Sequence, residues 1–255
     1  MPVIGFISPL GGTGRTALVA NVVTEWTQRH LRAVAVDLCP QNQLSGYLGC
    51  HAPPQLGWAT SAIADTWWGN AAQENSDGVG FLPHGSMPGS YFTDLQRMLV
   101  ERPNWLGDQL SFMDVAPDTT VLLDVPTWPS PVALQATGCS DVVMVTVDAS
   151  SRACQSRALI QDMVSSLPAR TIVGMVVTGF DARRPSHRSA FQTLRAQWGE
   201  LMLPYVMHAD ESVGLAHAQA MSVVRYAPQA QATADVQGVA NWLEVQTQIV
   251  ALGFA

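Results

Sequence analysis

Residues 3–16, VIGFISPLGGTGRT, decide the fold of this chain. The apolar run over 3–7 predicts a buried strand, and the residues after position 14 have the spacing of an amphipathic helix. Between them, Gly11, Gly12 and Gly14 let backbone N–H groups converge on an anion at the N-terminus of that helix. This order of strand, glycine loop and helix predicts a phosphate-binding loop, in which the hydroxyl group of Thr16 would bind Mg²⁺.

The loop differs from the usual phosphate-binding pattern at Arg15, which stands in place of a lysine. Arginine keeps the positive charge but presents a planar group with a different set of donors. The chain contains no lysine at all. The loop therefore indicates nucleotide binding rather than efficient hydrolysis. The alternative interpretation is a tight strand–helix turn without a ligand, since glycines at such a turn also allow close packing.

The composition is typical of a soluble protein with few charges, because 47% of its residues are hydrophobic and 13% are charged. A length of 255 residues suits a single domain over 1–255. The formal charge of −7 argues against broad affinity for nucleic acid or anionic lipid. No membrane-spanning run or secretion signal is visible, and the four cysteines lack the spacing of a zinc or redox site. We therefore expect a cytoplasmic protein with reduced thiols.

Short apolar runs alternate with helical patterns along the chain, which predicts an α/β fold. We expect a single domain with a predominantly parallel, twisted sheet and helices on both of its faces. The residues over 39–78 are less regular and indicate an insertion or switch region, in which Trp67 and Trp68 are expected to pack rather than to form a partner surface. The predicted strands cover 3–7, 33–37, 79–82, 121–124, 142–147, 172–177 and 201–206. The predicted helices lie near 16–30, 91–101, 150–166, 187–199 and 230–252.

Two aspartates stand at the ends of predicted strands. Asp37 ends the second strand and Asp124 ends the fourth. Because ligands of open parallel sheets bind at the carboxyl ends of the strands, both carboxylates are expected beside the glycine loop. Together with the hydroxyl of Thr16 they supply the hard oxygen ligands that Mg²⁺ prefers. Each aspartate taken alone could also be an ordinary strand-end or capping residue.

Three segments carry a resemblance to a known family: GGTGRT over 11–16, DLCPQ over 37–41, and DVP over 124–126. They resemble the deviant-Walker ATPases of the ParA/MinD class. Further segments are similar to the cellulose-synthase accessory branch of that class, the BcsQ type. These are GWA over 57–59, FLPHG over 81–85, LPYVMHADE over 203–211 and ANWL over 240–243. The resemblance therefore extends over nearly the whole chain.

The resemblance implies ATP or ADP and Mg²⁺ as ligands, held between two subunits of a nucleotide-dependent dimer. Metal binding would fall to Thr16, Asp37 and Asp124. The cofactor-binding residues implied are Gly11, Gly12, Thr13, Gly14, Arg15, Thr16, Ala17, Thr178 and Pro204.

Several positions depart from the hydrolytic pattern of that class. The signature lysine that reaches across the dimer corresponds to Leu10, and the carboxylate that positions the attacking water corresponds to Cys39. The phosphate-loop lysine corresponds to Arg15, and the asparagine used for base recognition corresponds to Thr178. No catalytic residue is therefore assigned, and Leu10 and Cys39 occupy the positions of absent hydrolytic groups. Because phosphoryl transfer depends on positioning and charge stabilisation, hydrolysis is expected to be weak or absent.

By resemblance, we expect a nucleotide-binding scaffold of the bacterial cellulose synthesis and secretion complex. It would form a homodimer or join a small accessory subunit, and protein partners would recruit it to the inner membrane. Nucleic acid is not expected as a partner, and the C-terminal helix lacks the basic residues of a membrane-binding tail. The alternative is an active ParA/MinD-type ATPase that positions DNA, a pole-localised machine or a membrane complex. A small-molecule kinase would need a substrate pocket that the sequence does not indicate.

Overall fold

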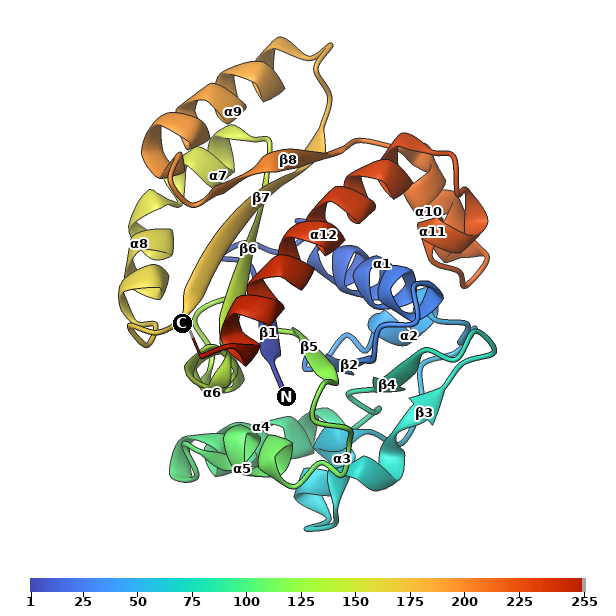
Figure 1. Ribbon diagram of the computed structural model, residues 1–255. Helices are drawn as coiled ribbons and strands as arrows, with labels where there is room; N and C mark the ends of the chain where they lie inside the picture. Colours follow the sequence, from blue (N-terminus) through green and yellow to red (C-terminus); the bar gives the residue numbers. More distant parts are fainter. Residues whose placement is uncertain (254–255) are drawn as a thin grey trace.

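The computed structural model describes residues 1–253, and one eight-stranded sheet runs through it (Figure 1). The strand order is β3-β4-β2-β5-β1-β6-β7-β8, and every neighbouring pair is parallel except β3 with β4. The predicted fold class, a predominantly parallel sheet with helices on both faces, is confirmed. The strands are β1 (Val3–Ile7), β2 (Ala33–Asp37), β3 (Gln73–Glu74), β4 (Gly80–Leu82), β5 (Thr120–Asp124), β6 (Val142–Asp148), β7 (Ile172–Phe180) and β8 (Met202–His208).

The central strands are buried because helices cover both faces of the sheet. Every residue of β1 and β5 is buried, as a near-continuous apolar sequence predicts for such strands. The parallel register pairs Phe6 with Asp124 and Asp37 with Asp124. The two predicted metal-binding aspartates therefore lie side by side at the carboxyl edge, next to the loop that follows β1.

The helices form two layers. One layer contains α1 and α12, which pack together on the Phe6 face of the sheet with α2 and α11 (Figure 1). The other layer contains α3 to α9 and packs on the Ile7 face. The helices are α1 (Arg15–Gln28), α2 (Leu44–Tyr47), α3 (Trp58–Ile63), η1 (Trp68–Ala71), α4 (Gly89–Glu101), α5 (Trp105–Ser111), α6 (Pro131–Cys139), α7 (Ser151–Gln155), α8 (Arg157–Ser165), α9 (Pro185–Trp198), α10 (Glu211–Ala218), α11 (Val223–Tyr226) and α12 (Gln231–Ala251).

The predicted helices near 16–30, 91–101, 187–199 and 230–252 are confirmed by α1, α4, α9 and α12. The helix predicted over 150–166 is instead two helices, since α7 ends before Ser156 and α8 begins after it. At this junction Ser156 leaves the helical conformation, with φ −79° and ψ 11°. The shorter helices were not predicted, because four to nine residues show too little periodicity to stand out from loop sequence.

The segment over 39–78, predicted to be irregular, contains only short elements but contributes to the core. Trp58 and Trp68 are fully buried, whereas Trp67 is 37% exposed. Two glycines bring α3 against the end of β4: a Cβ atom on Gly57 would lie 2.2 Å from the backbone of Gly85. This segment therefore packs on the sheet through tryptophan side chains and one close backbone contact. Within residues 1–253, no helix is long and apolar enough to cross a membrane.

Candidate nucleotide-binding site

The glycine loop lies between β1 and α1 and is open to a ligand. Gly12 and Gly14 adopt φ values of 77° and 72°, a left-handed conformation that favours glycine. A Cβ atom on Gly11, Gly12 or Gly14 would meet nothing within 4 Å. Gly14 begins α1 without a side-chain cap, and the first turn of α1 contains no acidic residue. Its first backbone N–H groups are therefore available to an anion.

The side chain of Thr13 points into the protein and fixes the loop from below. Its hydroxyl shares a hydrogen bond of 3.0 Å with the hydroxyl of Thr146 on β6. Its main-chain oxygen accepts a hydrogen bond of 2.6 Å from the hydroxyl of Thr178 on β7. Thr178 also lies 3.2 Å from the main-chain oxygen of Val147. The hydroxyl group of Thr178 therefore holds the loop, and the residue also lines the cavity beside it, so its role in cofactor binding stays a prediction.

Arg15 points away from the open side of the loop and onto the aspartate that ends β5. Its Nε–H donates to Oδ1 of Asp124 at 2.5 Å, and its Nη2 donates to Sγ of Cys39 at 2.8 Å. The Arg15 side chain is 12% exposed and that of Asp124 is fully buried. Burial is the largest single effect and lowers the pKa of Arg15, but the charge and hydrogen bond of Asp124 together with Cys39 and Asp37 outweigh it, so that the pKa is raised. The pair is therefore a buried ion pair with Arg15 protonated.

Thr16 and Asp37 complete the polar cluster around Asp124. The hydroxyl of Thr16 donates to Oδ2 of Asp124 at 2.6 Å. Asp37 accepts hydrogen bonds from the backbone N–H groups of Cys39 and Leu44, at 2.9 and 3.0 Å. Burial, and then the charge of Asp124, raises the pKa of Asp37 well above its usual range. The three predicted metal ligands are therefore brought together by β2, β5 and α1.

The donor atoms of this cluster fit a magnesium ion. One ligand atom from each of Asp37, Cys39 and Asp124 lies within 4.8 Å of the others. The carboxylate oxygens and the hydroxyl of Thr16 are hard donors, which Mg²⁺ prefers, whereas the thiol of Cys39 is soft. Burial raises the pKa of that thiol, so Cys39 stays neutral. Thr16, Asp37 and Asp124 would hold the ion, next to the guanidinium of Arg15.

A cavity of about 600 Å³ opens beside the glycine loop. Gly12, Thr13, Gly14 and Ala17 line one side of it. The opposite side is formed by residues at the carboxyl ends of β7 and β8 and after them, over 178–184 and 207–211. The cavity is therefore bounded by the loop and by the strand ends where a nucleotide base and ribose could lie.

Pro204, predicted to bind the cofactor, does not line this cavity. It is an exposed residue within β8, where the pairing with β7 is irregular. Because β8 continues to His208, Pro204 stands four residues, or about 13 Å, before the carboxyl end of its strand. A cofactor role for Pro204 therefore stays a prediction, and the cavity is lined instead by the residues over 207–211.

Leu10 offers no polar group to the site. Its side chain is half-buried and packs against the core cluster on the Ile7 face. Its backbone N–H donates to the hydroxyl of Ser8 at 3.1 Å. At the position that the resemblance assigns to a signature lysine, the loop therefore carries an apolar contact.

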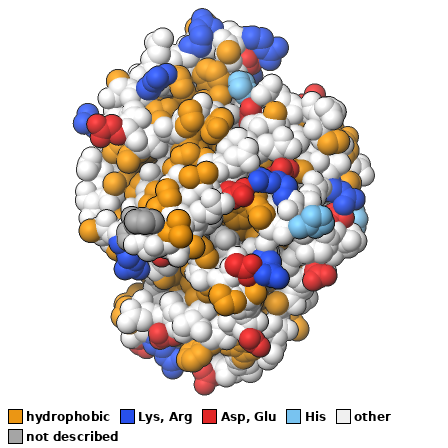
Figure 2. Space-filling view, viewed as in Figure 1, with side chains coloured by type: hydrophobic (Ala, Val, Ile, Leu, Met, Phe, Trp, Pro, Cys, Tyr) orange, Lys and Arg blue, Asp and Glu red, His pale blue; other side chains and the backbone are white. Residues whose placement is uncertain are grey.

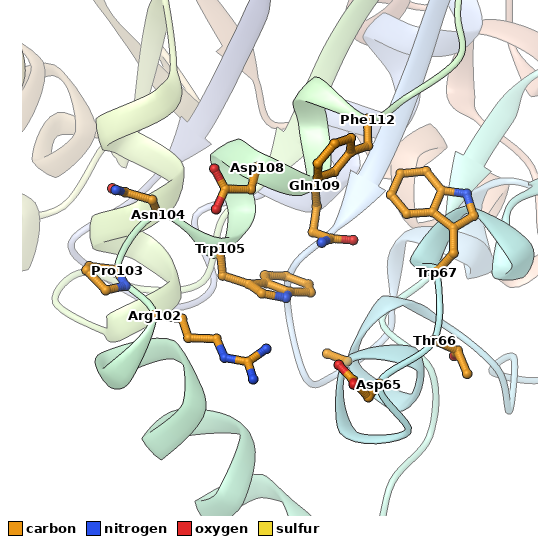
Figure 3. A pocket seen from close by; sticks show the side chains of 11 residues that line it. Asp65, Thr66, Trp67, Arg102, Pro103, Asn104, Trp105, Asp108, Gln109 and Phe112 are labelled. Atoms are coloured by element: carbon orange, nitrogen blue, oxygen red, sulfur yellow. The ribbon is translucent and has the colours of Figure 1, made fainter.

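A second cavity, of about 560 Å³, shares no residue with the loop (Figure 3). Trp67, Trp105 and Phe112 form aromatic walls in it. Trp105 is 5.6 Å from Trp58, measured between ring centroids, and the indole N–H of Trp58 donates to the main-chain oxygen of Asp37 at 2.8 Å. The tryptophans of this region therefore pack as one cluster that supports the end of β2.

The sheet order and the glycine loop at the end of its central strand define the fold of the ParA/MinD class of P-loop proteins. Solved structures with this fold include MinD from Pyrococcus horikoshii in complex with Mg-ADP (17% identity, TM-score 0.75, 95% of each chain covered). Another is the ATP complex of McdA from Cyanothece (16% identity, TM-score 0.78, 96% of each chain covered). At these identities the likeness shows the fold alone.

The family model described as "Cellulose biosynthesis protein BcsQ" matches residues 1–243, and the chain belongs to this family. The family predicted from the sequence is thereby confirmed. Among its relatives, BcsQ from Salmonella typhi is 24% identical over 247 residues, which cover 95% of this chain and 94% of that protein.

Sequence reasoning missed two residues that shape the site. Thr146 lies within a buried strand, and Trp58 opens a short helix in the segment predicted to be irregular. A threonine in an otherwise aliphatic strand was the available signal for Thr146, since a buried hydroxyl needs a partner. No local signal marks Trp58, because its hydrogen bond to Asp37 joins residues 21 positions apart.

Proposed function

We propose that this chain is a nucleotide-binding scaffold, weakly hydrolytic or non-hydrolytic, of the bacterial cellulose synthesis and secretion complex. Membership of the BcsQ family supports the link to cellulose synthesis. The proposal of nucleotide binding with weak hydrolysis rests on the open glycine loop at the N-terminus of α1, with an ion pair between Arg15 and Asp124 beneath it. The loop supplies phosphate contacts, whereas the groups beneath it are unsuited to rapid hydrolysis.

ATP or ADP with Mg²⁺ is the ligand that this site fits. MinD and McdA, whose folds are similar, were solved with Mg-ADP and with ATP. In this chain, backbone N–H groups of the loop over 11–16 would hold the phosphates, and the cavity lined by Ala17 would take the remainder of the nucleotide. Magnesium bound by Thr16, Asp37 and Asp124 would supply charge neutralisation at the phosphates.

Weak hydrolysis follows from the groups that surround the phosphates. Phosphoryl transfer needs a positioned water and cationic stabilisation of the transition state. Cys39 cannot act as a base because burial keeps its thiol neutral, and Leu10 carries no charge to offer a second subunit. Loss of a stabilising cation costs about 10³- to 10⁵-fold in rate in related phosphoryl transfers. Binding would survive, since it depends on the loop backbone.

The protein would work through partners in the cytoplasm, next to the inner membrane. A homodimer, a small accessory subunit of the cellulose synthase complex, or both would be its partners. Figure 2 shows acidic and basic side chains interspersed over one face of the molecule, which does not favour nucleic-acid binding there. The acidic balance of the whole chain supports the same conclusion.

Nucleotide binding and turnover measured on one preparation test this proposal. We expect ATP and ADP to bind, and turnover to stay well below ~1 per second, the lower end of typical enzyme rates. The variant Gly12→Val should lose binding because it strains the loop, whereas Gly89→Val, at an open position on the surface, should retain it. Turnover of ~1 per second or faster that disappears in Thr16→Ala would favour an active ParA/MinD-type ATPase instead.

A further inference from the structure

The ion pair between Arg15 and Asp124 occupies the carboxylate on which a magnesium site would depend. We propose that Arg15 is a tethered counter-ion that keeps divalent metal off Asp124 in the nucleotide-free protein, so that nucleotide binding does not require metal. The metal-binding comparison below depends only on the cluster itself. The statement about nucleotide rests on the proposed function.

Every carboxylate oxygen of the cluster already accepts a hydrogen bond. On Asp124, Oδ1 accepts from Arg15 and Oδ2 from Thr16. On Asp37, the two oxygens accept from the backbone N–H groups of Cys39 and Leu44. Because Arg15 and Thr16 already engage the two oxygens of Asp124, a metal ion that entered would compete with the guanidinium for this carboxylate.

The guanidinium competes well because it is attached to the chain. A tethered group acts at an effective concentration on the order of millimolar or more. Asp124 is fully buried, so removal of Arg15 would leave its carboxylate without a counter-charge. Free metal at low concentration is therefore a poor competitor, and the positive charge required by Asp124 is already present.

Cys39 gives the guanidinium a second anchor. Nε of Arg15 bonds to Asp124 while Nη2 bonds to Sγ of Cys39, so the planar group bridges β5 and the segment after β2. A lysine at this position has one compact ammonium group and could not present the same pair of donors.

Manganese binding to the nucleotide-free protein tests the proposal directly, with paramagnetic resonance of free Mn²⁺ as the readout. We expect wild-type protein to show no Mn²⁺ binding below ~1 mM, and Arg15→Ala to bind Mn²⁺ at least about tenfold more tightly. The added binding should disappear in Arg15→Ala combined with Asp124→Asn. Arg97→Ala, which removes an exposed arginine paired only with Asp94, is the matched control and should behave as wild type.

The nucleotide arm compares ADP binding in Mg²⁺ and in EDTA by calorimetry. We expect the dissociation constant of wild-type protein to change less than about threefold, and that of Arg15→Ala to rise at least about tenfold in EDTA. Metal dependence of about tenfold or more in wild type would overturn this arm. Absence of ADP binding under both conditions would instead refute the proposed function and leave the Mn²⁺ comparison intact.

Two outcomes overturn the proposal on metal. One is Mn²⁺ binding by wild-type protein within about threefold of that of Arg15→Ala. The other is tight Mn²⁺ binding by wild-type protein that is abolished in Asp124→Asn. This second comparison does not require that an Arg15 variant folds. Circular dichroism and urea unfolding establish that each variant is folded. If Arg15→Ala does not fold, Arg15→Gln keeps a side chain of similar reach without the charge and takes its place.

Discussion

Replacing Thr178 by valine removes one buried hydroxyl group while it keeps the shape of the side chain. Thr178 is 6% exposed, and its hydroxyl lies 2.6 Å from the main-chain oxygen of Thr13 and 3.2 Å from that of Val147. The shorter of these hydrogen bonds joins the last turn of the phosphate-binding loop to β7. We expect Thr178→Val to loosen the loop without disturbing the packing of the sheet.

The magnitude follows from the number of acceptors left without a donor. A buried acceptor that loses its partner costs about 1–3 kcal/mol. The oxygen of Thr13 depends on Thr178 more strongly, since the contact with Val147 is long. We therefore expect a loss of about 1–2 kcal/mol in the free energy of unfolding. If half of this free-energy loss destabilises the loop conformation that binds ADP, the affinity for ADP falls about threefold.

Urea unfolding followed by far-ultraviolet circular dichroism measures the first effect, and calorimetry with ADP measures the second. Thr178→Ser keeps the hydroxyl and should stay near wild type, and Thr193→Val, on the exposed side of α9, should be neutral in both assays. If Thr178→Val unfolds at the same urea concentration as Thr178→Ser, the hydroxyl does not hold the loop and the reasoning is refuted.

Three further changes test the packing around the site. Trp58→Phe removes the N–H that donates to the oxygen of Asp37 and should lower the free energy of unfolding by about 1–3 kcal/mol in urea; an unchanged midpoint would contradict this. Gly85→Ala places a Cβ atom 2.7 Å from the nitrogen of Gly57, at a residue whose φ is 85°. It should lower the free energy of unfolding, measured by thermal unfolding, by about 2 kcal/mol or more. A variant as stable as wild type would refute the close contact. Burial raises the pKa of the Cys39 thiol, so iodoacetamide at pH 8 should label Cys39 only after the protein is unfolded. Mass spectrometry detects the label, and rapid labelling of the native protein would refute the burial of Cys39.

The local parts of the fold and site could be predicted from the sequence because their signals are contiguous. The strand, glycine loop and helix over 3–28 follow from one hydrophobic pattern and the glycine spacing. The neighbourhood of Asp37 and Asp124 follows from a general rule, since the carboxyl ends of parallel strands meet at one edge. Both inferences need only sequence order and strand direction.

The sequence-based predictions differ from the structure where strand length or long-range contacts determine the arrangement. The end predicted for the last strand, at 206, lies two residues before the observed end at His208. The strand predicted over 172–177 likewise continues to Phe180, which places Thr178 inside the sheet. Strand ends depend on pairing with a neighbour, which a single sequence does not reveal.

The direction in which the Arg15 side chain points could not be predicted either, because two residues that are distant in sequence determine it. Asp124 and Cys39 lie 109 and 24 positions away, on or after different strands. An aspartate at position 39 would add a third buried carboxylate to Asp37 and Asp124, and one guanidinium could not balance the three. A neutral thiol there adds no charge, and burial followed by the charge of Asp124 raises the pKa of Asp37 to about 8, so the guanidinium is paired with Asp124. The substitutions at positions 15 and 39, which the sequence indicates as related departures from the hydrolytic pattern, therefore act on one charge balance around Asp124.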